Sequence, residues 1–355
     1  MTLNNIPKIK LGNLEFNLIQ GGMGVGISQE NLAAAVANEG GAGIIASVGL
    51  GLLGKYDRSD TEALRETIRA ARRKTNGVIG VNIMHVLTNY EDQVKVAVEE
   101  GVDLIISGAG IPKNLPSFLE EKNIKLLPIV GSARLANMLC KYWSNQYNHL
   151  PDGIIVEGPM AGGHLAYSKE QLADPNFVTY GLEEIVKEVV KAVEPFGKIP
   201  VIAAGGIFYG GDIKRFQEIG AAGVQMATRF VTTDECDADI RFKQAYLNSH
   251  PEDIIIIKSP VGMPGRAINN EFLRRVTRGE TVPTGCGYHC IKSCTPNESP
   301  YCIAQALINA QRGNLDKGFA FCGSNAYRTK EFGIVPVKQV FESLDREYVE
   351  GRTSS

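Results

Sequence analysis

Apolar residues occur along most of the chain in short, uninterrupted runs separated by longer stretches of mixed polarity. A run such as Ile199–Ala204 shows no alternation of apolar and polar positions, which is typical of strands in a parallel sheet with helices on both faces. In the stretch Thr61–Lys74, Leu64 and Ile68 lie on one face at helical spacing. The pattern therefore predicts strands that alternate with helices.

Eight such runs precede position 231. The predicted strands are Phe16–Gln20, Ala42–Ala46, Gly77–Ile83, Asp103–Ser107, Lys125–Val130, Gly153–Glu157, Ile199–Ala204 and Gly223–Met226. The predicted helices between them are Gln29–Glu39 capped by Ser28, Thr61–Lys74, Tyr90–Glu100, Pro112–Lys122, one opened by Ser132, Gly181–Glu194 and one within Phe208–Gly220. Eight parallel strands with helical crossovers predict an α/β fold, a closed (β/α)8 barrel of the TIM type, with a doubly wound open sheet as the alternative.

The rhythm of strands and helices breaks after Phe230, where we expect a smaller C-terminal lid or extension. The predicted organisation is a barrel over 1–230, a lid or substrate region over 231–335, and a last helix with a tail over 336–355. The elements expected there are a helix Asp237–Asn248, a strand Asp253–Lys258, a turn-rich stretch Ser259–Gly265, and helices Ile303–Arg312 and Pro336–Glu350. We expect the tail Gly351–Ser355 to be disordered.

Small residues end the last two predicted barrel strands. Gly205 and Gly206 follow one strand, and Ala227 with Thr228 follows the next. Glycine lets backbone N–H groups approach an anion closely, and (β/α)8 barrels hold phosphates after strands seven and eight. The two ends together predict a phosphate site, although a Gly-Gly pair alone is commonly just a tight turn.

Other candidates stand at strand ends. Met23 follows Gly21-Gly22 and is interpreted as a contact of a flat ring, with a core methionine as the alternative. Asn82 ends the third strand as a ligand contact or a cap. His164 ends a glycine-rich loop after strand six and can exchange protons near neutral pH, unless its ring only holds the loop. His85, at another strand end, is its rival.

Composition narrows the class of partner. A net charge of −2 and a pI near 6.3 give no footprint for a polyanion, so we expect a small-molecule substrate and no nucleic acid. The N-terminus lacks a signal-peptide pattern and no apolar run has membrane-spanning length, so the expectation is a cytoplasmic protein without a membrane partner. A homodimer is left open.

Four of the seven cysteines are concentrated in one short stretch, as Cys286, Cys290, Cys294 and Cys302. An odd total in a chain of cytosolic type argues against a disulfide framework. The spacing matches no standard zinc or iron–sulfur pattern, so no metal site is predicted and the thiols are expected to pin a lid. Metal binding stays open as the alternative.

The motifs, taken in order, resemble those of a known family. They are Ile19-Gln-Gly-Gly-Met23, Gly80-Val-Asn82, Gly158 with Ala161-Gly-Gly-His164, Pro200-Val-Ile-Ala-Ala-Gly-Gly206, and Gly223-Val-Gln-Met-Ala-Thr-Arg-Phe230. This set is similar to the nitronate monooxygenase (2-nitropropane dioxygenase) family of FMN-dependent barrels over about 16 to 345. The same superfamily holds FMN-dependent enoyl-ACP reductases and NAD(P)H:quinone reductases.

The resemblance implies a role for each matching residue. Gly22 and Met23 would lie along the isoalloxazine ring, Asn82 would hydrogen-bond the flavin, and His164 would be the catalytic histidine. The residues implied to hold the phosphate are Gly163, Gly205, Gly206, Ala227 and Thr228.

The chain departs from the family pattern at three positions. Many relatives carry Glu where this chain has Met160, and its polar role is then expected to shift to Glu157. Ala166 and Ala227 stand where relatives frequently have Gly. The extra methyl group of alanine needs little room at these positions if their φ angles are negative.

Function follows from the resemblance as an expectation. The leading hypothesis is an FMN-dependent oxidoreductase that oxidises alkyl nitronates with oxygen. The alternative is an enoyl-ACP, enoyl-thioester or quinone reductase that uses NAD(P)H as reductant on the same FMN scaffold. A barrel that merely binds a phosphorylated metabolite, without redox chemistry, is the third hypothesis.

Overall fold

The computed structural model describes residues 5–54, 59–119, 122–282, 286, 289–292, 294–295 and 298–354. Within these residues eight parallel strands form one sheet with the order β3-β11-β10-β8-β7-β6-β5-β4. The strands are β3 (Ile19–Gln20), β4 (Gly43–Ala46), β5 (Ile79–Met84), β6 (Leu104–Gly108), β7 (Lys125–Val130), β8 (Ile154–Glu157), β10 (Val201–Ala204) and β11 (Gly223–Met226). A parallel bridge between Ile19 and Ala42 closes the sheet into a barrel.

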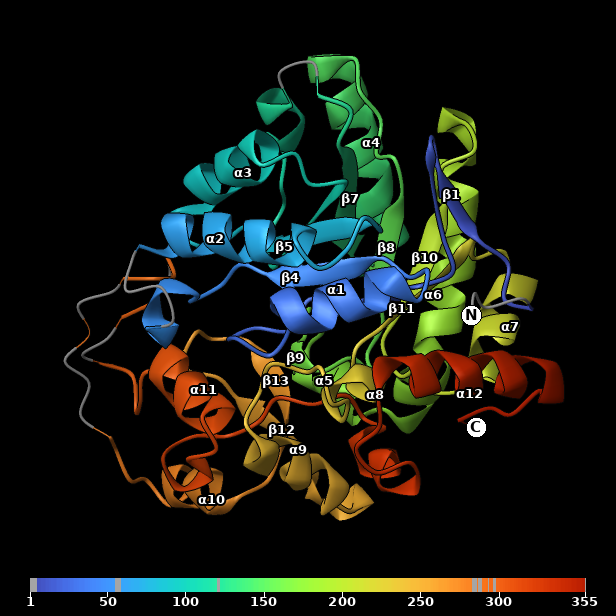
Figure 1. Cartoon of the computed structure of the whole chain (residues 1–355). Coiled ribbons are helices and arrows are strands. Elements are labelled where there is room, and N and C mark those ends of the chain that lie inside the picture. The colour runs from blue at the N-terminus through green and yellow to red at the C-terminus, as the bar shows by residue number, and fades with distance from the viewer. Residues whose placement is uncertain are drawn as a thin grey trace.

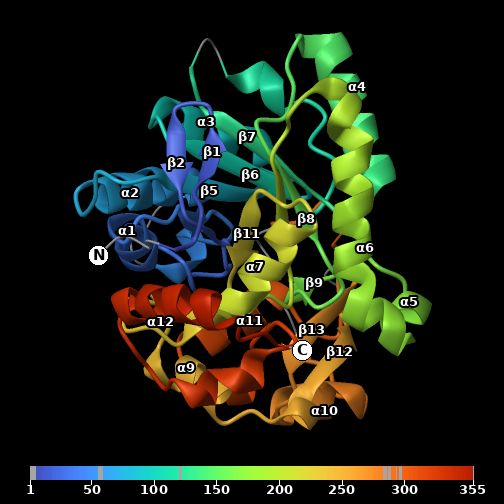
Figure 2. The ribbon, with the colours of Figure 1, turned by 90° about the vertical axis from the view of Figure 1, so that its right-hand side faces the viewer.

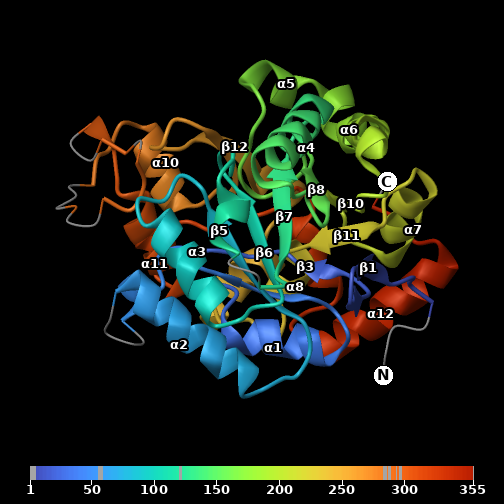
Figure 3. The same cartoon turned by 90° about the horizontal axis from the view of Figure 1, so that it is seen from above.

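Helices surround this barrel, as the view from above shows (Figure 3). They are α1 (Glu30–Asn38), α2 (Asp60–Arg72), α3 (Tyr90–Glu99), α4 (Ala133–Tyr147), α6 (Pro175–Val193), α7 (Gly210–Glu218) and the short α8 (Thr228–Val231). The predicted TIM-type barrel is therefore confirmed, and the open sheet is excluded by the bridge between the first and second strands.

Two apolar layers stabilise the barrel. The interior layer consists of alternate strand residues, among them Ile19, Ile44, Leu104, Ile106, Leu127, Ile155 and Ile202. A hairpin of β1 (Ile9–Leu11) and β2 (Leu14–Phe16) adds side chains to the same cluster and so fills one end of the barrel. Burial of these side chains is the main favourable term for folding.

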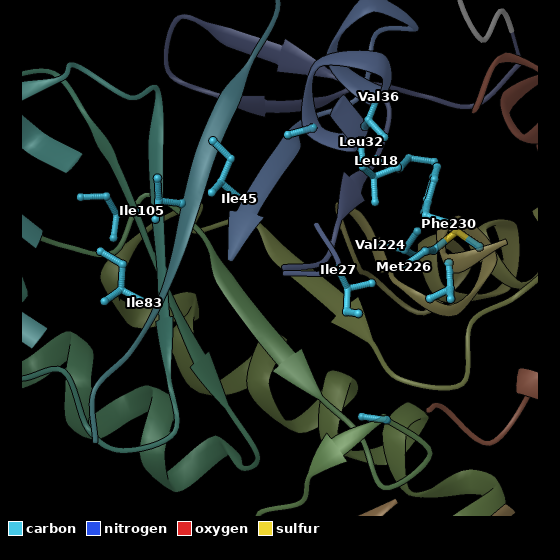
Figure 4. Close-up of a cluster of buried hydrophobic side chains, with 14 of the residues drawn as sticks. Leu18, Ile27, Leu32, Val36, Ile45, Ile83, Ile105, Val224, Met226 and Phe230 are labelled. Carbon is cyan, nitrogen blue, oxygen red and sulfur yellow. The ribbon is translucent and has the colours of Figure 1, made fainter. Parts of the chain in front are cut away.

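The outer layer lies between the strands and the helices. Figure 4 shows Leu18, Leu32 and Val36 meeting where α1 packs on the barrel, with Met226 and Phe230 beside them. All five side chains are buried. Leu32 and Val36 are four residues apart, so they lie on one face of α1, and this apolar face packs against the sheet.

Several predicted elements need correction. Phe16 belongs to β2, so only Ile19–Gln20 of the first predicted strand lies in the barrel. In the predicted helix Pro112–Lys122, the described residues form the 3-10 turn Leu115–Phe118, with Pro116 at its start, and residues 120–121 lie outside the described part of the chain. Ser28 is not the cap of α1; its hydroxyl accepts a hydrogen bond from the N–H of Met23 at 2.9 Å. By contrast, Ser132 caps α4 as predicted.

Most of the chain after α8 covers one face of the barrel (dark yellow to red in Figures 1 and 2), while its last helix packs on α7 and α1 beside the barrel. Its elements are α9 (Ile240–Leu247), β12 (Ile254–Lys258), β13 (Pro264–Ile268), α10 (Glu271–Thr277), α11 (Ile303–Gln311) and α12 (Val337–Glu350). The stretch Ser259–Gly265 was expected to be rich in turns, but its last two residues begin β13, which pairs with β12 and with β9 (Gly163–His164). We call residues 232–335 of this C-terminal part the lid. The lid is thus joined to the loop that follows β8, where α5 (Lys169–Ala173) also lies.

The C-terminal tail is ordered where the structure describes it, so the expectation of disorder is wrong for 351–354. Ser354 donates hydrogen bonds from its N–H and its hydroxyl to the carboxylate of Asp212, which lies in the first turn of α7. Among the described residues no helix is long and apolar enough to cross a membrane.

Candidate active site

Two adjoining cavities open at the carboxyl ends of the barrel strands, with volumes of about 200 Å³ and about 390 Å³. We call them the small cavity and the apolar cavity. The small cavity is lined by Gly22, Met23, Glu157, Gly163, Gly205, Gly206, Ala227 and Thr228. The apolar cavity is lined by Gly22, Asn82, Glu157, Gly163 and His164 together with many aliphatic side chains. Every residue for which the resemblance implies a flavin-binding or catalytic role therefore lines at least one of these two adjoining cavities.

The turn Gly205–Gly206 forms the floor of the small cavity. Both residues have positive φ angles, +99° and +82°, which L side chains rarely adopt. A Cβ atom on Gly206 would lie 2.7 Å from Cβ of Met160. Asn325 fixes the turn from the other side, because its Nδ2 donates to the carbonyl of Gly206 at 2.7 Å. The turn is thus held open by packing and by a hydrogen bond.

Thr228 is the first residue of α8 and, like the glycine turn, lines the small cavity; we call the glycine turn and Thr228 together the cup. A Cβ built on Gly323 would lie 2.6 Å from the hydroxyl oxygen of Thr228, so the segment after Cys322 touches Thr228 closely. Ala227 has φ of −124°. That negative angle explains why alanine is tolerated at a position where relatives frequently have glycine.

One unpartnered polar atom in the lining points to a ligand in this site. Oε1 of Gln225 is buried without a hydrogen-bond partner among the described residues, and Gln225 lines both cavities. Oγ of Ser324, next to the lining residue Gly323, is also buried without a partner among these residues, but Ser324 is not part of the lining of either cavity. Buried polar atoms are normally hydrogen-bonded, so a polar ligand edge at Gln225 would satisfy its oxygen. The glycine cup and Gln225 fit a flavin mononucleotide, which carries a phosphate and a polar ring edge.

Gly22 lines both cavities and Asn82 lines the apolar cavity; we call the space beside these two residues the slot. A Cβ on Gly22 would approach Cβ of Asn82 to 2.5 Å, so glycine is needed for the turn after β3 to come this close to Asn82 on β5. Met23 is partly buried against the core, and its N–H is held by Ser28. Gly22 and Met23 line the small cavity and Asn82 lines the apolar cavity; their contact with a flat aromatic ring stays a prediction.

His164 lies in the wall of the apolar cavity. Its Nε2 is 2.7 Å from the hydroxyl oxygen of Ser259, and its ring packs edge-on against Phe321 with centroids 5.0 Å apart. Burial lowers the pKa of His164 to about 4. The imidazole is therefore neutral near pH 7, which argues against a standing imidazolium. His85, its rival, packs against Tyr90 and is not among the described residues lining either cavity.

Arg266 holds the loop that carries His164. Its guanidinium is buried and donates to the carbonyls of Pro159 and Ala161 at 2.7 and 2.6 Å. Burial lowers the pKa of Arg266 to about 10. Since Arg266 belongs to β13, this contact and the β9–β13 pairing both fix the glycine-rich loop against the lid.

Glu157 ends β8 and lines both cavities. Its backbone carbonyl accepts a hydrogen bond from the hydroxyl of Tyr167. Burial raises the pKa of the Glu157 carboxyl to about 7. The side chain can therefore donate or accept a proton near neutral pH.

Some site residues were not recognised in the sequence. They are Gln225, Ser259, Arg266, Ser324 and Asn325. Ser324 and Asn325 stand in the run Cys322-Gly-Ser-Asn325, whose small polar composition is the local signal that could have found them. Ser259 and Arg266 act on residues about a hundred positions away, which no local pattern reveals.

Comparison with known proteins adds independent observations. The family model described as nitronate monooxygenase matches residues 5–347. A curated "Probable nitronate monooxygenase" from Staphylococcus saprophyticus is 28% identical over 74% of this chain and 78% of its own length. A Mycobacterium tuberculosis protein named (3aS,4S,5R,7aS)-5-hydroxy-7a-methyl-1-oxo-octahydro-1H-indene-4-carboxyl-CoA dehydrogenase is 29% identical over 77% of this chain and 68% of its own length.

Two solved structures have the same fold as this chain. FabK from Thermotoga maritima superposes with a TM-score of 0.75 at 30% identity and covers 96% of this chain and 94% of its own. A nitroalkane oxidase from Streptomyces ansochromogenes has a TM-score of 0.74 at 22% identity, covering 95% and 96%, and so supports the fold.

Proposed function

The chain belongs to the nitronate monooxygenase family, and we propose that it is an FMN-dependent oxidoreductase that oxidises alkyl nitronates with oxygen. One observation carries the proposal: a cup of glycine and hydroxyl residues adjoins an apolar cavity whose wall carries a neutral histidine. The cup suits a phosphate, the slot suits a flat ring, and the apolar cavity suits a small alkyl substrate above that ring.

The chain's own residues divide the work. When bound, FMN would supply the redox chemistry. Gly205, Gly206 and Thr228 would hold its phosphate, and Gln225 would meet its polar edge. The apolar wall would exclude water from the reacting atoms.

His164 would handle the proton. With a neutral nitroalkane, the uncharged imidazole would accept the α-proton. With a nitronate already formed, the negative charge of the substrate would instead raise the pKa of His164 and favour a donated hydrogen bond. Ser259 would keep the ring in one orientation in both cases, because it holds Nε2.

A second function is favoured by the apolar cavity itself. It has a volume of about 390 Å³, and its largely aliphatic lining extends beyond the proposed flavin contacts Gly22 and Asn82 to Ile303 and Leu307. That space suits the acyl chain of an enoyl thioester reduced with NAD(P)H, and quinone reduction would use the same walls. The two functions share the FMN site and differ in substrate and reductant.

An anaerobic titration separates these functions. We expect the purified protein to show flavin absorbance, and we expect an alkyl nitronate to bleach it without oxygen. Bleaching by NADH or NADPH alone, followed by recovery with an enoyl thioester or a quinone, would identify a reductase instead. Protein that binds no flavin when incubated with FMN would contradict both functions and leave a non-redox barrel.

The phosphate cup has its own test. Thr228→Val removes the hydroxyl and keeps the shape, so we expect FMN binding to weaken by about 1.5–3 kcal/mol, the value of a hydrogen bond to a charged group. Thr228→Ser, which keeps the hydroxyl, is the matched control and should bind FMN nearly normally. Flavin fluorescence during titration measures both constants. Unchanged affinity in Thr228→Val would place the phosphate elsewhere.

A further inference from the structure

Residues 351–354, which we call the tail, pack beside the first turn of α7, and Figure 3 shows the C-terminal end of the chain near this helix. The N–H of Gly211 donates to the carbonyl of Arg352 at 2.9 Å. Ser354 binds the carboxylate of Asp212 through its N–H at 2.9 Å and through its hydroxyl at 2.6 Å. These hydrogen bonds join the tail to the helix that follows the glycine turn.

Two glycines at the start of α7 make room for this contact. A Cβ atom on Gly210 would lie 2.0 Å from the carbonyl oxygen of Leu344 on α12, and one on Gly211 would lie 2.3 Å from that of Arg352. Neither glycine has a positive φ angle. Glycine is therefore needed here for the close approach of two backbones and not for a left-handed conformation.

One chain of hydrogen bonds runs from the tail to the glycine turn. Nη2 of Arg328 donates to the carbonyl of Ser354 at 2.7 Å, and its Nε donates to Oδ1 of Asn325 at 3.0 Å. Nδ2 of Asn325 donates in turn to the carbonyl of Gly206 at 2.7 Å. Because Arg328 holds the oxygen of the buried Asn325 amide, the NH2 group stays directed toward Gly206.

A second chain of contacts reaches the residues between the glycine turn and α7. Oδ2 of Asp212 accepts the hydroxyl of Ser354. The same oxygen accepts the N–H groups of Phe208 and Tyr209 at 3.0 and 2.9 Å. The guanidinium of Arg352 lies over the ring of Tyr209, 4.2 Å from its centroid. The tail is thus connected to both halves of the segment that joins β10 to α7.

The first chain of hydrogen bonds orients one peptide group at the small cavity. A peptide unit is planar, so holding the carbonyl of Gly206 also fixes the direction of the N–H of Ile207. This peptide is trans, so the N–H points away from that carbonyl and hence away from Asn325. Ile207 lines the small cavity, and Asn325 does not. The N–H of Ile207 is therefore a candidate donor to a phosphate, and its direction depends on Asn325.

We propose that the tail positions the glycine turn, through Arg328 with Asn325 and through Asp212, and thereby gives the site its preference for a phosphorylated flavin. The inference rests on the proposed function, because it takes the small cavity as the site of the FMN phosphate. The described lining of that cavity does not include Arg328, Asn325 or Asp212. They act as positioning residues, since their effect on a ligand passes through the backbone of the turn.

The effect is expected only at the phosphate end of the flavin. Both chains of contacts end between Gly206 and Asp212. The slot proposed for the ring lies beside Gly22 and Asn82, and no described residue of the tail lines either cavity. Riboflavin has the same ring and ribityl chain as FMN but no phosphate. Its affinity therefore reports on the slot, whereas the affinity for FMN reports on the slot and the cup together.

Two variants release the tail. Arg328→Met removes the guanidinium that joins Ser354 to Asn325 and keeps much of the side-chain volume. A chain that ends after Gly351 lacks both chains of contacts. We expect each variant to weaken FMN binding by about tenfold or more, the size of one lost hydrogen bond to a charged group, and to change riboflavin binding by less than about twofold. Flavin fluorescence, measured during titration of the flavin-free protein, gives both dissociation constants.

Lys330→Met is the matched control, because Lys330 lies in the same 3-10 turn as Arg328, Ala326–Glu331, and is exposed. It should bind both flavins as the wild type does. If the tail only stabilises the fold, FMN and riboflavin will lose affinity equally, so an unchanged ratio of the two constants in both tail variants would overturn the inference. Arg328→Met decides alone if the shortened chain does not fold. Wild-type protein without a preference for FMN over riboflavin would instead contradict the phosphate cup, and this inference with it.

Discussion

Replacing His164 with Asn is expected to lower turnover of a neutral nitroalkane by about 10²–10⁴-fold, the usual share of a positioned general base. Asparagine is polar and of similar size but cannot take up the proton. The loss should be much smaller with a nitronate prepared beforehand, because that substrate has already lost its α-proton. Steady-state kinetics with both forms, and flavin content measured on the same samples, check this result.

The pH profile gives the same residue a second signature. A histidine with an ordinary pKa would lose its basic form below about pH 6.5. Burial lowers the pKa of His164 to about 4, so the basic form persists to lower pH. We therefore expect kcat/KM for a neutral nitroalkane to fall only as the pH approaches 4, and this acid limb should vanish in His164→Asn.

Two further variants separate chemistry from structure. Ser259→Ala removes the hydroxyl 2.7 Å from Nε2 and leaves the imidazole in place, so it should cost less activity than His164→Asn. His85→Asn changes a histidine outside the described lining of both cavities and should stay near the wild-type rate. Full activity in His164→Asn, or a comparable loss in His85→Asn, would move the catalytic role away from His164.

The sequence predicts the barrel well because its strands are continuous apolar runs. Lys125–Val130 and Gly223–Met226 have the predicted limits, since the outer face of each strand packs under helices and the inner face points into the barrel, so that most of their side chains are apolar. The prediction fails at Pro112–Lys122, where prolines at 112 and 116 deny the backbone donors that a longer helix requires. The prediction also misses that Phe16 belongs to the β1–β2 hairpin, whose side chains fill one end of the barrel. Strands of three residues are too short for an alternation of apolar and polar positions to be recognised.

The candidate site was predictable only where its chemistry is local. Gly205, Gly206 and Thr228 follow their strands directly, so their position in the sequence already fixes their position in the barrel. Arg266 and Ser259 come from the lid, and their contacts with the His164 loop depend on the β9–β13 pairing. Such pairing between distant segments has no counterpart in the composition of either segment.

The second large effect concerns a buried ion pair behind the phosphate cup. Oε1 of Glu347, on α12, accepts a hydrogen bond from Nη2 of Arg229 at 3.0 Å. The side chain of Glu347 is 1% exposed and that of Arg229 is 2% exposed. Arg229 follows Thr228 directly and also donates to Ser343 and to the carbonyl of Phe208. The C-terminal helix thus positions α8, whose first residue closes the cup.

Glu347 also accepts a hydrogen bond at the N-terminus of a second helix, α7. Its Oε2 accepts the N–H of Gly210, the first residue of α7, at 3.0 Å. Asp212 accepts the N–H groups of Phe208 and Tyr209 in the turn before it. Since protein carboxylates already occupy these donors, the proposed FMN phosphate would be left with the Gly205–Gly206 turn and Thr228.

Glu347→Gln is therefore expected to lower the free energy of unfolding by about 3–5 kcal/mol, the cost of leaving a buried charge without its partner. FMN affinity should fall as well, because Arg229 would no longer hold α8 in place. Urea unfolding of the flavin-free protein and an FMN titration measure the two effects. Glu350→Gln on the same helix is the matched control, since its pair with Arg346 is exposed and 3.9 Å long, and the expected change is below about 1 kcal/mol.

A double variant decides whether the loss in Glu347→Gln comes from the stranded charge. Arg229→Met combined with Glu347→Leu removes both charges and keeps apolar volume, so its destabilisation should be clearly smaller than the sum of the two single changes. The hydroxyl of Ser343 and the carbonyl of Phe208 would still lose their guanidinium donor, which sets the remaining cost. Additive losses in the double variant would mean that packing of α12, and not the ion pair, holds the cup.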